Sequence, residues 1–476
     1  MPRFSMRPFK SAAYAFVPTL FRHHFFAEPI SASRPRATAY LDGARGFAAV
    51  AVLNYHFYYA YSDLAEAPWD FQNPFSMPVI RLWFSAGGAI PIFFIFGGYS
   101  LAWKPLSQMS SGKEDASQAA MATLSSSAFR RLLRLYLPLA AITFIVASLI
   151  QLGAYEPTRS RLGASGPDLS RMREKHLEIS SSFMQSILRW LWDILGATGF
   201  WDWKNYGPDH DKHLWTILSE FRCSIALYVT LLATARLRCR VRLAIIVLLS
   251  IHSMWWYRWD VTNFYWGVIL AQLDIILDAS AKRSRDAGGR SPTIIPELEK
   301  GQKSGPDRVD TQIIRRLGLS ALFFFSLWCL SAPLWNWNTA WGYQTIASIV
   351  PSHYGARDKA VPALGVVLLQ RCLYMSSADS RYTMLFTNSV ALYLGKISFS
   401  LYLVHGPVLH SLGYNLPSLI WSIIGKETAF TYAFGIVVGW LIAVSLCLSA
   451  ADVFHREIEM RCVSSADWIE RKCMEP

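Results

Sequence analysis

Hydrophobic residues recur along the chain in long runs that are separated by shorter polar segments. A helix needs about 20 apolar residues to cross the core of a bilayer, so each run is a candidate membrane span. The predicted spans, about ten in number, cover residues 41–61, 85–103, 132–153, 213–234, 242–257, 261–278, 316–334, 361–378, 391–412 and 429–450. The pattern therefore predicts an all-α, polytopic integral membrane protein.

One aromatic segment does not fit this pattern of spans. Residues 183–203 are rich in Trp, Phe and Leu, but Arg189 and Asp193 interrupt them. Because Trp and Tyr concentrate where the bilayer meets water, we expect this segment to form a helix that lies along the membrane surface.

Composition agrees with a membrane protein, and the distribution of charge predicts its orientation. Of the 476 residues, 53% are hydrophobic and 17% are charged, and the formal net charge is +13. Lys and Arg gather before the first span, before the third, after the fourth, in residues 279–315 and after the last span. With ten spans these segments fall on one side, and loops rich in Lys and Arg stay cytosolic. We therefore expect both termini in the cytosol and relate the positive charge to topology, with no nucleic-acid partner.

The predicted organisation is one transmembrane domain over residues 40–455. A basic cytosolic arm, residues 1–39, precedes it, with a transit peptide as the alternative for this segment. A cytosolic tail, residues 456–476, follows it. The longest polar connections are a non-cytosolic loop at 154–212 and a cytosolic loop at 279–315.

Neither the cysteines nor the histidine-rich stretch of the chain predicts a metal site. Seven cysteines are scattered without a CxxC pair, so we expect thiols and no disulfide framework. The stretch GPDHDKH, residues 207–213, has the residue types of a metal site, but its candidate ligands are crowded and lack partners at suitable spacing. We therefore predict no bound metal and no permanently bound cofactor.

Three ionisable residues stand in the first predicted span. In a helix, Arg45 and His56 lie within about 20° of one face and about 16 Å apart along the axis, and Asp42 is one turn from Arg45. The three residues thus form one stripe, with charge at the cytosolic end and an imidazole deep in the membrane. Ionisable residues inside a membrane are costly and are functional candidates. The alternative is that His56 packs helices and that Arg45 reaches to the interface.

Glu220 and His405 are expected at a depth similar to that of His56, in the non-cytosolic third of the bilayer. Helical rise places Glu220 about 10 Å from the non-cytosolic end of its span and His405 about 20 Å from the cytosolic end of another. A carboxylate can orient an imidazole and stabilise its cation, as general-base catalysis requires. The alternatives are an ion pair of Glu220 with Arg222 or Lys212, and a hydrogen bond of His405 that packs its helix.

Three arginines, Arg130, Arg131 and Arg134, stand at the cytosolic start of the third span. Arg131 and Arg134 share one helical face. The guanidinium group binds phosphate through a planar fork of donors, so an acyl-coenzyme A donor would fit here. The alternative is an anchor to anionic lipid head groups.

These residues occur in stretches that resemble the membrane-bound acyltransferase family 3, especially its fungal members. The matching stretches, in the family's order, are YLDGARGFAAVAVLNYHF, IFFIFGGYSLAWKP, FRRLLRLYLP, HLWTILSEFRCS, YLGKISFSLYLVHGPVLH and AADVFHREIE, from residue 40 to about 460. One departure is Ala44, where Leu is more usual. The resemblance implies a membrane enzyme of about ten helices that moves an acyl group, often acetyl, from acyl-CoA to a hydroxyl or an amine.

The resemblance also implies roles for the candidate residues. Arg45 and His56 match the family's pattern of Arg and His separated by ten residues, in which the His is the expected base. Arg131 and Arg134 match its Arg-x-x-Arg element near the donor, and Glu220 matches the carboxylate of its WTxxxE stretch. An oxyanion donor is also needed, and its candidates are Asn54, Tyr55, Ser398 and Tyr402. Fungal members often serve natural-product pathways, so the expected acceptor is a small hydroxylated metabolite and the expected location is the endoplasmic reticulum or another endomembrane.

Other functions stay open from the sequence. In a proton-coupled transporter, the buried His, Glu and Arg residues would relay protons. In a two-step enzyme, His56 would itself carry the acyl group across the membrane. A non-catalytic scaffold is disfavoured by the expected convergence of ionisable groups.

Overall fold

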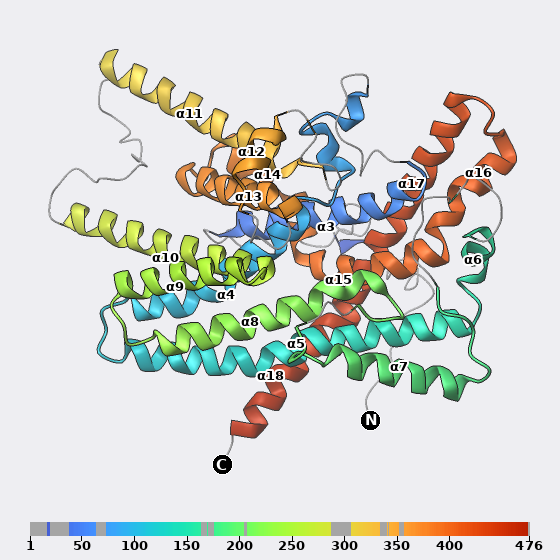
Figure 1. Ribbon diagram of the computed structural model, residues 1–476, viewed down its shortest axis with the longest axis horizontal. Helices are drawn as coiled ribbons and strands as arrows, with labels where there is room; N and C mark the ends of the chain where they lie inside the picture. The colour runs from blue at the N-terminus through green and yellow to red at the C-terminus, as the bar shows by residue number, and fades with distance from the viewer. Residues whose placement is uncertain are drawn as a thin grey trace, which may run out of the picture.

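The computed structural model describes residues 17–19, 38–62, 73–162, 169, 176–203, 207–286, 306–333, 340, 342–351 and 357–474. Within these ranges the chain is helical and contains no strand, which confirms the predicted all-α class. The helices α4, α5, α8, α9 and α10 pack against one another in the lower half of the molecule (Figure 1). Most of the predicted arm 1–39 and the middle of the predicted loop 279–315 lie outside the described residues.

Every predicted span contains a helix, as long runs of apolar residues dictate. These helices are α3 (Ala39–Tyr59), α4 (Ala89–Met109), α5 (Ala116–Gln151), α8 (Trp215–Ala233), α9 (Cys239–Trp255), α10 (Trp259–Asp286), α11 (Pro306–Leu330), α13 (Arg357–Met375), α15 (Ser389–Ser411) and α17 (Ala429–Phe454). The largest boundary error is at α5, which begins 16 residues before the predicted span. A short link joins α9 to α10, and the two helices pack against each other as a tight hairpin.

Six stretches of helix are long and apolar enough to cross a membrane, namely Ala89–Met109, Ala116–Gln151, Lys212–Ala233, Trp259–Arg283, Gln312–Leu330 and Ala429–Met474. The count of about ten spans is therefore not confirmed within the described residues. The predicted spans outside this set are those of α3, α9, α13 and α15, and α9 is short, with 17 residues. The sides on which the termini lie stay a prediction.

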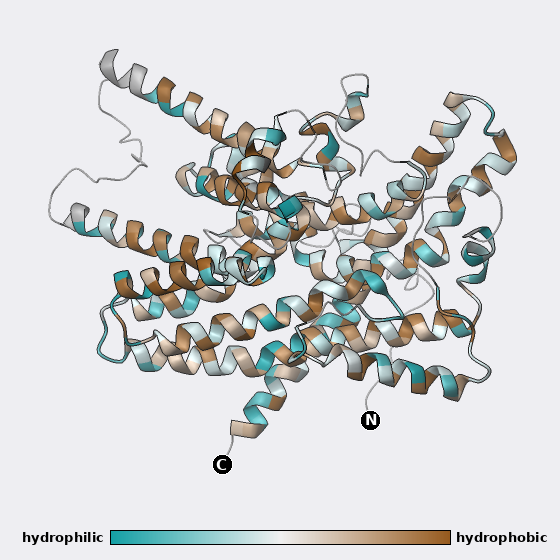
Figure 2. Cartoon of the chain, in the orientation of Figure 1, coloured by the Kyte–Doolittle hydropathy of each residue, from teal (hydrophilic) through white to brown (hydrophobic). Residues whose placement is uncertain are grey.

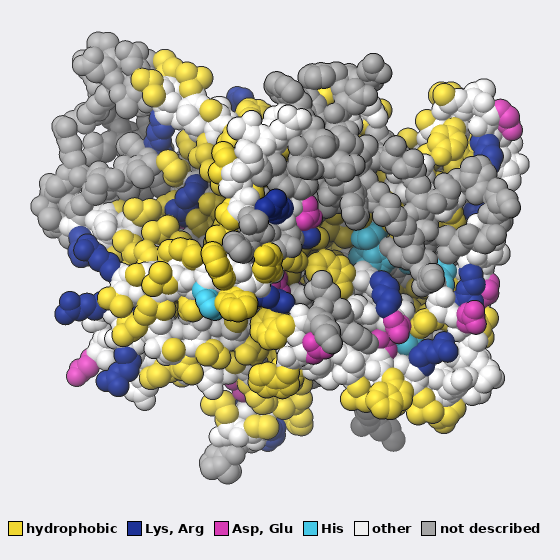
Figure 3. Space-filling view, viewed as in Figure 1, with side chains coloured by type: hydrophobic (Ala, Val, Ile, Leu, Met, Phe, Trp, Pro, Cys, Tyr) yellow, Lys and Arg dark blue, Asp and Glu magenta, His cyan; other side chains and the backbone are white. Residues whose placement is uncertain are grey.

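The surface of the long helices is apolar, as expected of a protein that faces lipid. Large hydrophobic side chains are exposed on α9 (Leu248, Ile251), on α11 (Phe324) and on α17 (Val437, Leu441). Figure 2 shows hydrophobic residues along most of the long helices, and Figure 3 shows hydrophobic side chains gathered over a wide area with basic side chains at its edge. Apolar patches of this size mark contact with a membrane or a partner.

The segments between and after the predicted spans are more ordered than their polar sequence indicates. Residues 183–203 contain α7 (Phe183–Ala197), with apolar residues such as Trp192 exposed, as the predicted surface helix requires. The predicted cytosolic loop is helical at both ends, because α10 continues to Asp286 and α11 begins at Pro306. The predicted tail forms a π-helical turn (His455–Glu459) and α18 (Met460–Met474), which packs against α5. The remaining α-helices of the described residues are α6 (Glu156–Leu162), α12 (Tyr343–Ile349), α14 (Arg381–Thr387) and α16 (Leu416–Ile424).

Helices α3 and α15 are the pair that positions the site. They pack closely where Gly46 meets Gly395, and a Cβ atom added to Gly46 would lie 2.4 Å from the backbone nitrogen of Gly395. A Cβ atom added to Gly395 would lie 2.4 Å from the carbonyl oxygen of Asp42. Glycine at both positions lets the two backbones approach each other, as small residues do at helix crossings in membranes.

Candidate active site

The site is a cluster of three histidines from three separate segments: His56 on α3, His405 on α15, and His213 in the short 3-10 helix Lys212–Leu214. Helices α3 and α15 run in the same direction from the Gly46–Gly395 contact. His56 and His405 each follow ten residues after their glycine, a rise of about 15 Å in a helix. Equal spacing from one crossing therefore brings the two imidazoles to the same level.

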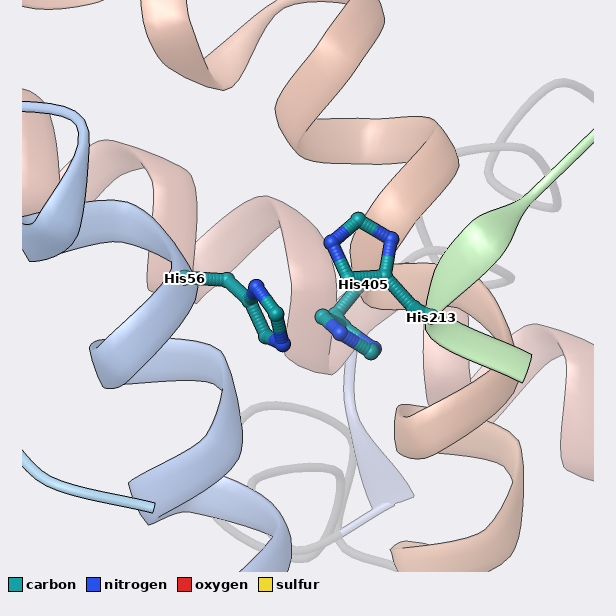
Figure 4. A group of neighbouring side chains, drawn as sticks. All are labelled: His56, His213 and His405. Carbon is teal, nitrogen blue, oxygen red and sulfur yellow. The ribbon is translucent and has the colours of Figure 1, made fainter. Parts of the chain in front are cut away.

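The three imidazole rings lie close together and point toward one another (Figure 4). The ring centroids of His56 and His213 are 4.1 Å apart, and those of His405 lie 5.2 Å from His56 and 5.1 Å from His213. One nitrogen of each ring lies within 4.8 Å of a nitrogen of the others. His213 and His405 are buried and His56 is partly buried, so the cluster is largely withdrawn from solvent.

A buried carboxylate supports this cluster. One oxygen of Asp211 accepts a hydrogen bond from Nδ1 of His213 at 2.8 Å and another from its backbone N–H at 3.0 Å. Burial by itself raises the pKa of Asp211, but the nearby imidazoles, with His213 first, more than offset it and leave the pKa below its usual value. Asp211 is therefore an anion that favours positive charge on the histidine cluster.

Tyr402 holds His405 and His213 in place. Its carbonyl oxygen accepts a hydrogen bond from Nδ1 of His405 at 2.7 Å. Its hydroxyl donates to the carbonyl of His213 and accepts from the hydroxyl of Thr216 at 2.6 Å. Because a carbonyl oxygen only accepts, Nδ1 of His405 carries a proton and Nε2 has the lone pair in the neutral ring.

The loop that carries His213 is fixed to α7 by a second buried carboxylate. Asp193 accepts hydrogen bonds from the backbone N–H groups of Asp209 and His210, at 2.8 and 3.0 Å, and from Nδ1 of His210 at 2.6 Å. The acid that interrupts the apolar sequence of α7 thus anchors the stretch 207–213. A fixed loop keeps the rotamer of a functional side chain defined.

The cluster extends into a chain of further histidines. The ring of His410, one and a half turns after His405 on α15, lies 5.4 Å from that of His213. Nδ1 of His410 is 2.5 Å from Nε2 of His176. A small cavity of about 20 Å³ lies beside this chain, between α5, residues 209–213 and His410. This arrangement provides a polar path that leads away from His213.

The structure gives Glu220 a different partner from those predicted. Its carboxylate bonds Arg131 at 2.5 Å, and the same guanidinium donates to the hydroxyl of Ser224 at 3.0 Å. The predicted contact with His56 is not formed among the described residues, and the predicted alternative pairs with Arg222 or Lys212 are not formed either. Helical rise gave Glu220 a depth but could not give it a direction around the helix axis, and the acid beside the histidines is Asp211.

The predicted phosphate-binding arginines are engaged with acids. Arg130 and Arg134 each bond Asp467 of α18 at 3.0 Å, and Arg130 also bonds Glu470 at 3.1 Å. These pairs are partly exposed, so water and salt weaken them. The arginines remain candidates for a phosphate site, with the carboxylates of α18 as competitors.

The remaining predicted residues lie in or near α3 and α15. The amide of Asn54 donates to the carbonyl of Trp83 at 3.0 Å and accepts from the indole of Trp440 at 2.9 Å. The hydroxyl of Ser398 bonds the carbonyl of Gly395 in its own helix. The ring of Tyr55 has its centroid 5.0 Å from that of His56. Asp42 and Arg45 lie one turn apart and are half-buried.

Two residues of the site were missed in the sequence, Asp211 and His213. Both lie in GPDHDKH, a stretch in which a metal site was sought among its own residues and rejected. The partners of His213 lie 157 residues before it and 192 residues after it, so no local spacing could have shown them. The signal that could have found them is the stretch 207–213 itself, if it is considered as one of three segments that together form a site.

A helical chain with membrane-length apolar segments and a buried imidazole–carboxylate cluster has the features of a membrane-embedded enzyme. The family model described as an acyltransferase domain (Acyl_transf_3) matches residues 38–276 and 302–450. The chain therefore belongs to this acyltransferase family, as the sequence resemblance predicted, and the protein is an acyltransferase.

Fungal proteins are among its relatives. The chain is 29% identical over 466 residues to the O-acetyltransferase PaAT-1 of Phomopsis amygdali, over 92% of this chain and 85% of the relative. It is 26% identical to the acyltransferase R4 of a Phoma species, over 89% and 94% of the two chains, and 26% identical to the acyltransferase clz18 of Cochliobolus lunatus, over 92% and 97%. No solved structure gives a significant match to the chain.

Proposed function

We propose that the protein is a membrane O-acyltransferase that moves an acyl group, most simply acetyl, from acyl-CoA to a hydroxyl group of a small molecule. The observation that carries the proposal is the cluster of His56 with His213, Asp211 and His405. Acyl transfer needs a base for the acceptor proton, and an imidazole has its ordinary pKa near the working pH of such a reaction. The name of the relative PaAT-1 supports O-acetylation.

His56 is the proposed general base. It takes the proton of the acceptor hydroxyl as the oxygen attacks the thioester carbonyl, and a carbon–oxygen bond forms. The carbon–sulfur bond then breaks, and the imidazolium returns the proton to the thiolate of coenzyme A, which leaves an ester and free coenzyme A. His213 lies next to His56 and is hydrogen-bonded to the buried Asp211. The His213–Asp211 pair therefore stabilises the positive charge that His56 carries between the two proton transfers.

The donor's phosphates are proposed to bind at Arg131 and Arg134, with Arg130 beside them. The contacts of Arg130 and Arg134 with carboxylates of α18 support this proposal, because they bring two guanidinium groups to one oxygen anion. Phosphates carry more charge than the single carboxylate of Asp467 and would displace it. Arg45, which lies on α3 with His56, is proposed to face the donor arm.

The acceptor is proposed to be a small hydroxylated metabolite, and the enzyme to lie in the endoplasmic reticulum or another endomembrane. The fungal relatives and the apolar helices support this setting. Tyr55 remains the proposed donor to the oxyanion, because Asn54 and Ser398 are bonded within the helical scaffold and the hydroxyl of Tyr402 already donates to the carbonyl of His213.

The test is acyl transfer by membranes that contain the protein. Membranes from a host without related enzymes are given acetyl-CoA and an extract of candidate metabolites, and products are detected by the mass of an added acyl group. His56→Gln keeps a polar side chain of similar length but removes the base, so product formation should fall at least about 100-fold, the lower range of general-base effects. The control is His252→Gln, because His252 is exposed on α9. Full activity of His56→Gln would refute the assignment.

A further inference from the structure

The three-histidine cluster has a second chemical capacity besides proton transfer. His56, His213 and His405 come from three segments, and their nitrogens lie within 4.8 Å of one another. Three histidines around one point are the protein ligands of a class of zinc site in which a fourth position stays open. Each imidazole can give a neutral nitrogen lone pair, which suits Zn²⁺, Cu²⁺ and Ni²⁺.

The surrounding hydrogen bonds select the nitrogen that a metal would use. Nδ1 of His405 donates to the carbonyl of Tyr402, and Nδ1 of His213 donates to the carboxylate of Asp211. In the neutral state this places the lone pair of both rings on Nε2. Histidine ligands in metal sites usually donate their other N–H to a carbonyl or a carboxylate in this way, which fixes the ring and raises its basicity. Two of the three histidines therefore already have such supporting partners.

The dimensions of the cluster are close to those of a bound ion. Zinc–nitrogen bonds of about 2.0–2.1 Å in a tetrahedron put the ligand nitrogens about 3.4 Å apart. The nitrogens lie within 4.8 Å, so rotation of the side chains by about 1 Å each closes the site. His56 is partly buried, whereas His213 and His405 are buried.

The geometry points to a site for one divalent transition-metal ion, of the zinc type, held by His56, His213 and His405, whose occupation switches off acyl transfer. A metal on His56 takes the same lone pair that the base needs, so the ion and the acceptor proton compete. The inhibitory half of this inference rests on the proposed role of His56, while the binding half does not. It differs from the sequence-based prediction of no metal because that prediction considered only residues 207–213.

The binding half is tested with the full chain, purified in detergent and stripped with a chelator. Zn²⁺ is titrated against a metallochromic indicator, and one ion per chain should bind. Asp211→Asn should weaken binding by about 10- to 100-fold, as loss of a supporting partner does in metal sites. His405→Gln and His213→Gln, which each remove a ligand, should weaken it at least as much. His252→Gln is the matched control and should bind like the unchanged protein.

The inhibitory half is tested by acyl transfer at increasing free Zn²⁺. The rate should fall in step with the occupancy measured in the titration, and a chelator should restore it. If Asp211→Asn, His213→Gln and His405→Gln bind zinc as tightly as His252→Gln does, the proposed site is wrong. Zinc that binds there and raises the rate would overturn the inhibition. If no acyl transfer is seen with any donor in metal-free protein, the proposed function fails, and the titration alone still decides the metal site.

Discussion

The change Gly406→Ala is a sharp test of the site, because Gly406 follows His405 on α15 and faces the other half of the cluster. A Cβ atom at this position would lie 2.6 Å from Oδ2 of Asp211 and 2.9 Å from Nδ1 of His213. Both distances are shorter than the 3.4 Å at which ordinary contact begins. The change therefore adds one methyl group that pushes directly on the Asp211–His213 pair.

The size of the effect follows from this geometry. The Asp211 carboxylate must retreat by about 0.8 Å, the gap between 2.6 and 3.4 Å. A misplacement of about 1 Å at a catalytic group can reduce the rate about 100-fold, which corresponds to about 2.7 kcal/mol of transition-state stabilisation. Alanine is the better helix former, by up to about 1 kcal/mol, so the helix itself should not be weakened.

The assay compares kcat for acyl transfer and the amount of folded protein in membranes. We expect Gly406→Ala to reduce kcat by about 10- to 100-fold while the folded protein stays near its normal amount. The matched control is Gly97→Ala on α4, where a Cβ atom meets only the ring of Phe264 at 3.5 Å or beyond. If Gly406→Ala keeps full activity, or loses no more than Gly97→Ala does, the Asp211–His213 pair has no part in the reaction.

Other changes test the scaffold and the donor site. Asp467→Asn removes the carboxylate that competes for Arg130 and Arg134. It should lower the KM for acyl-CoA by about two- to fivefold, the range that a partly exposed ion pair allows. A raised KM would argue against phosphate binding at these arginines. Gly46→Val places side-chain atoms in the backbone of α15 and should abolish folded protein in size-exclusion chromatography, whereas Gly318→Ala, with nothing within 4 Å of its Cβ, should not. Tyr402→Phe leaves the carbonyl of His213 without its hydroxyl donor and should lower stability by about 1–3 kcal/mol; an unchanged melting temperature would contradict this.

The helices were predictable because their signal is local. A run of apolar residues that must leave water has to satisfy its own backbone hydrogen bonds, and a helix is the structure that does so within one segment. All of the predicted spans are therefore helical, from α3 to α17. Their number as membrane spans was less predictable, since α3, α9, α13 and α15 are not among the stretches long and apolar enough to cross a membrane.

The sequence by itself determined that His56 and His405 are ionisable residues within apolar helices and are therefore functional candidates. Helical rise along the two predicted spans also placed them at a similar depth. The tertiary structure decided which partners they have. Glu220 pairs with Arg131, and the cluster includes Asp211 and His213, which lie in a connecting segment. Spacing along one helix fixes height and face within that helix, but the contacts between segments depend on how whole helices pack, and that packing brought the three imidazoles together.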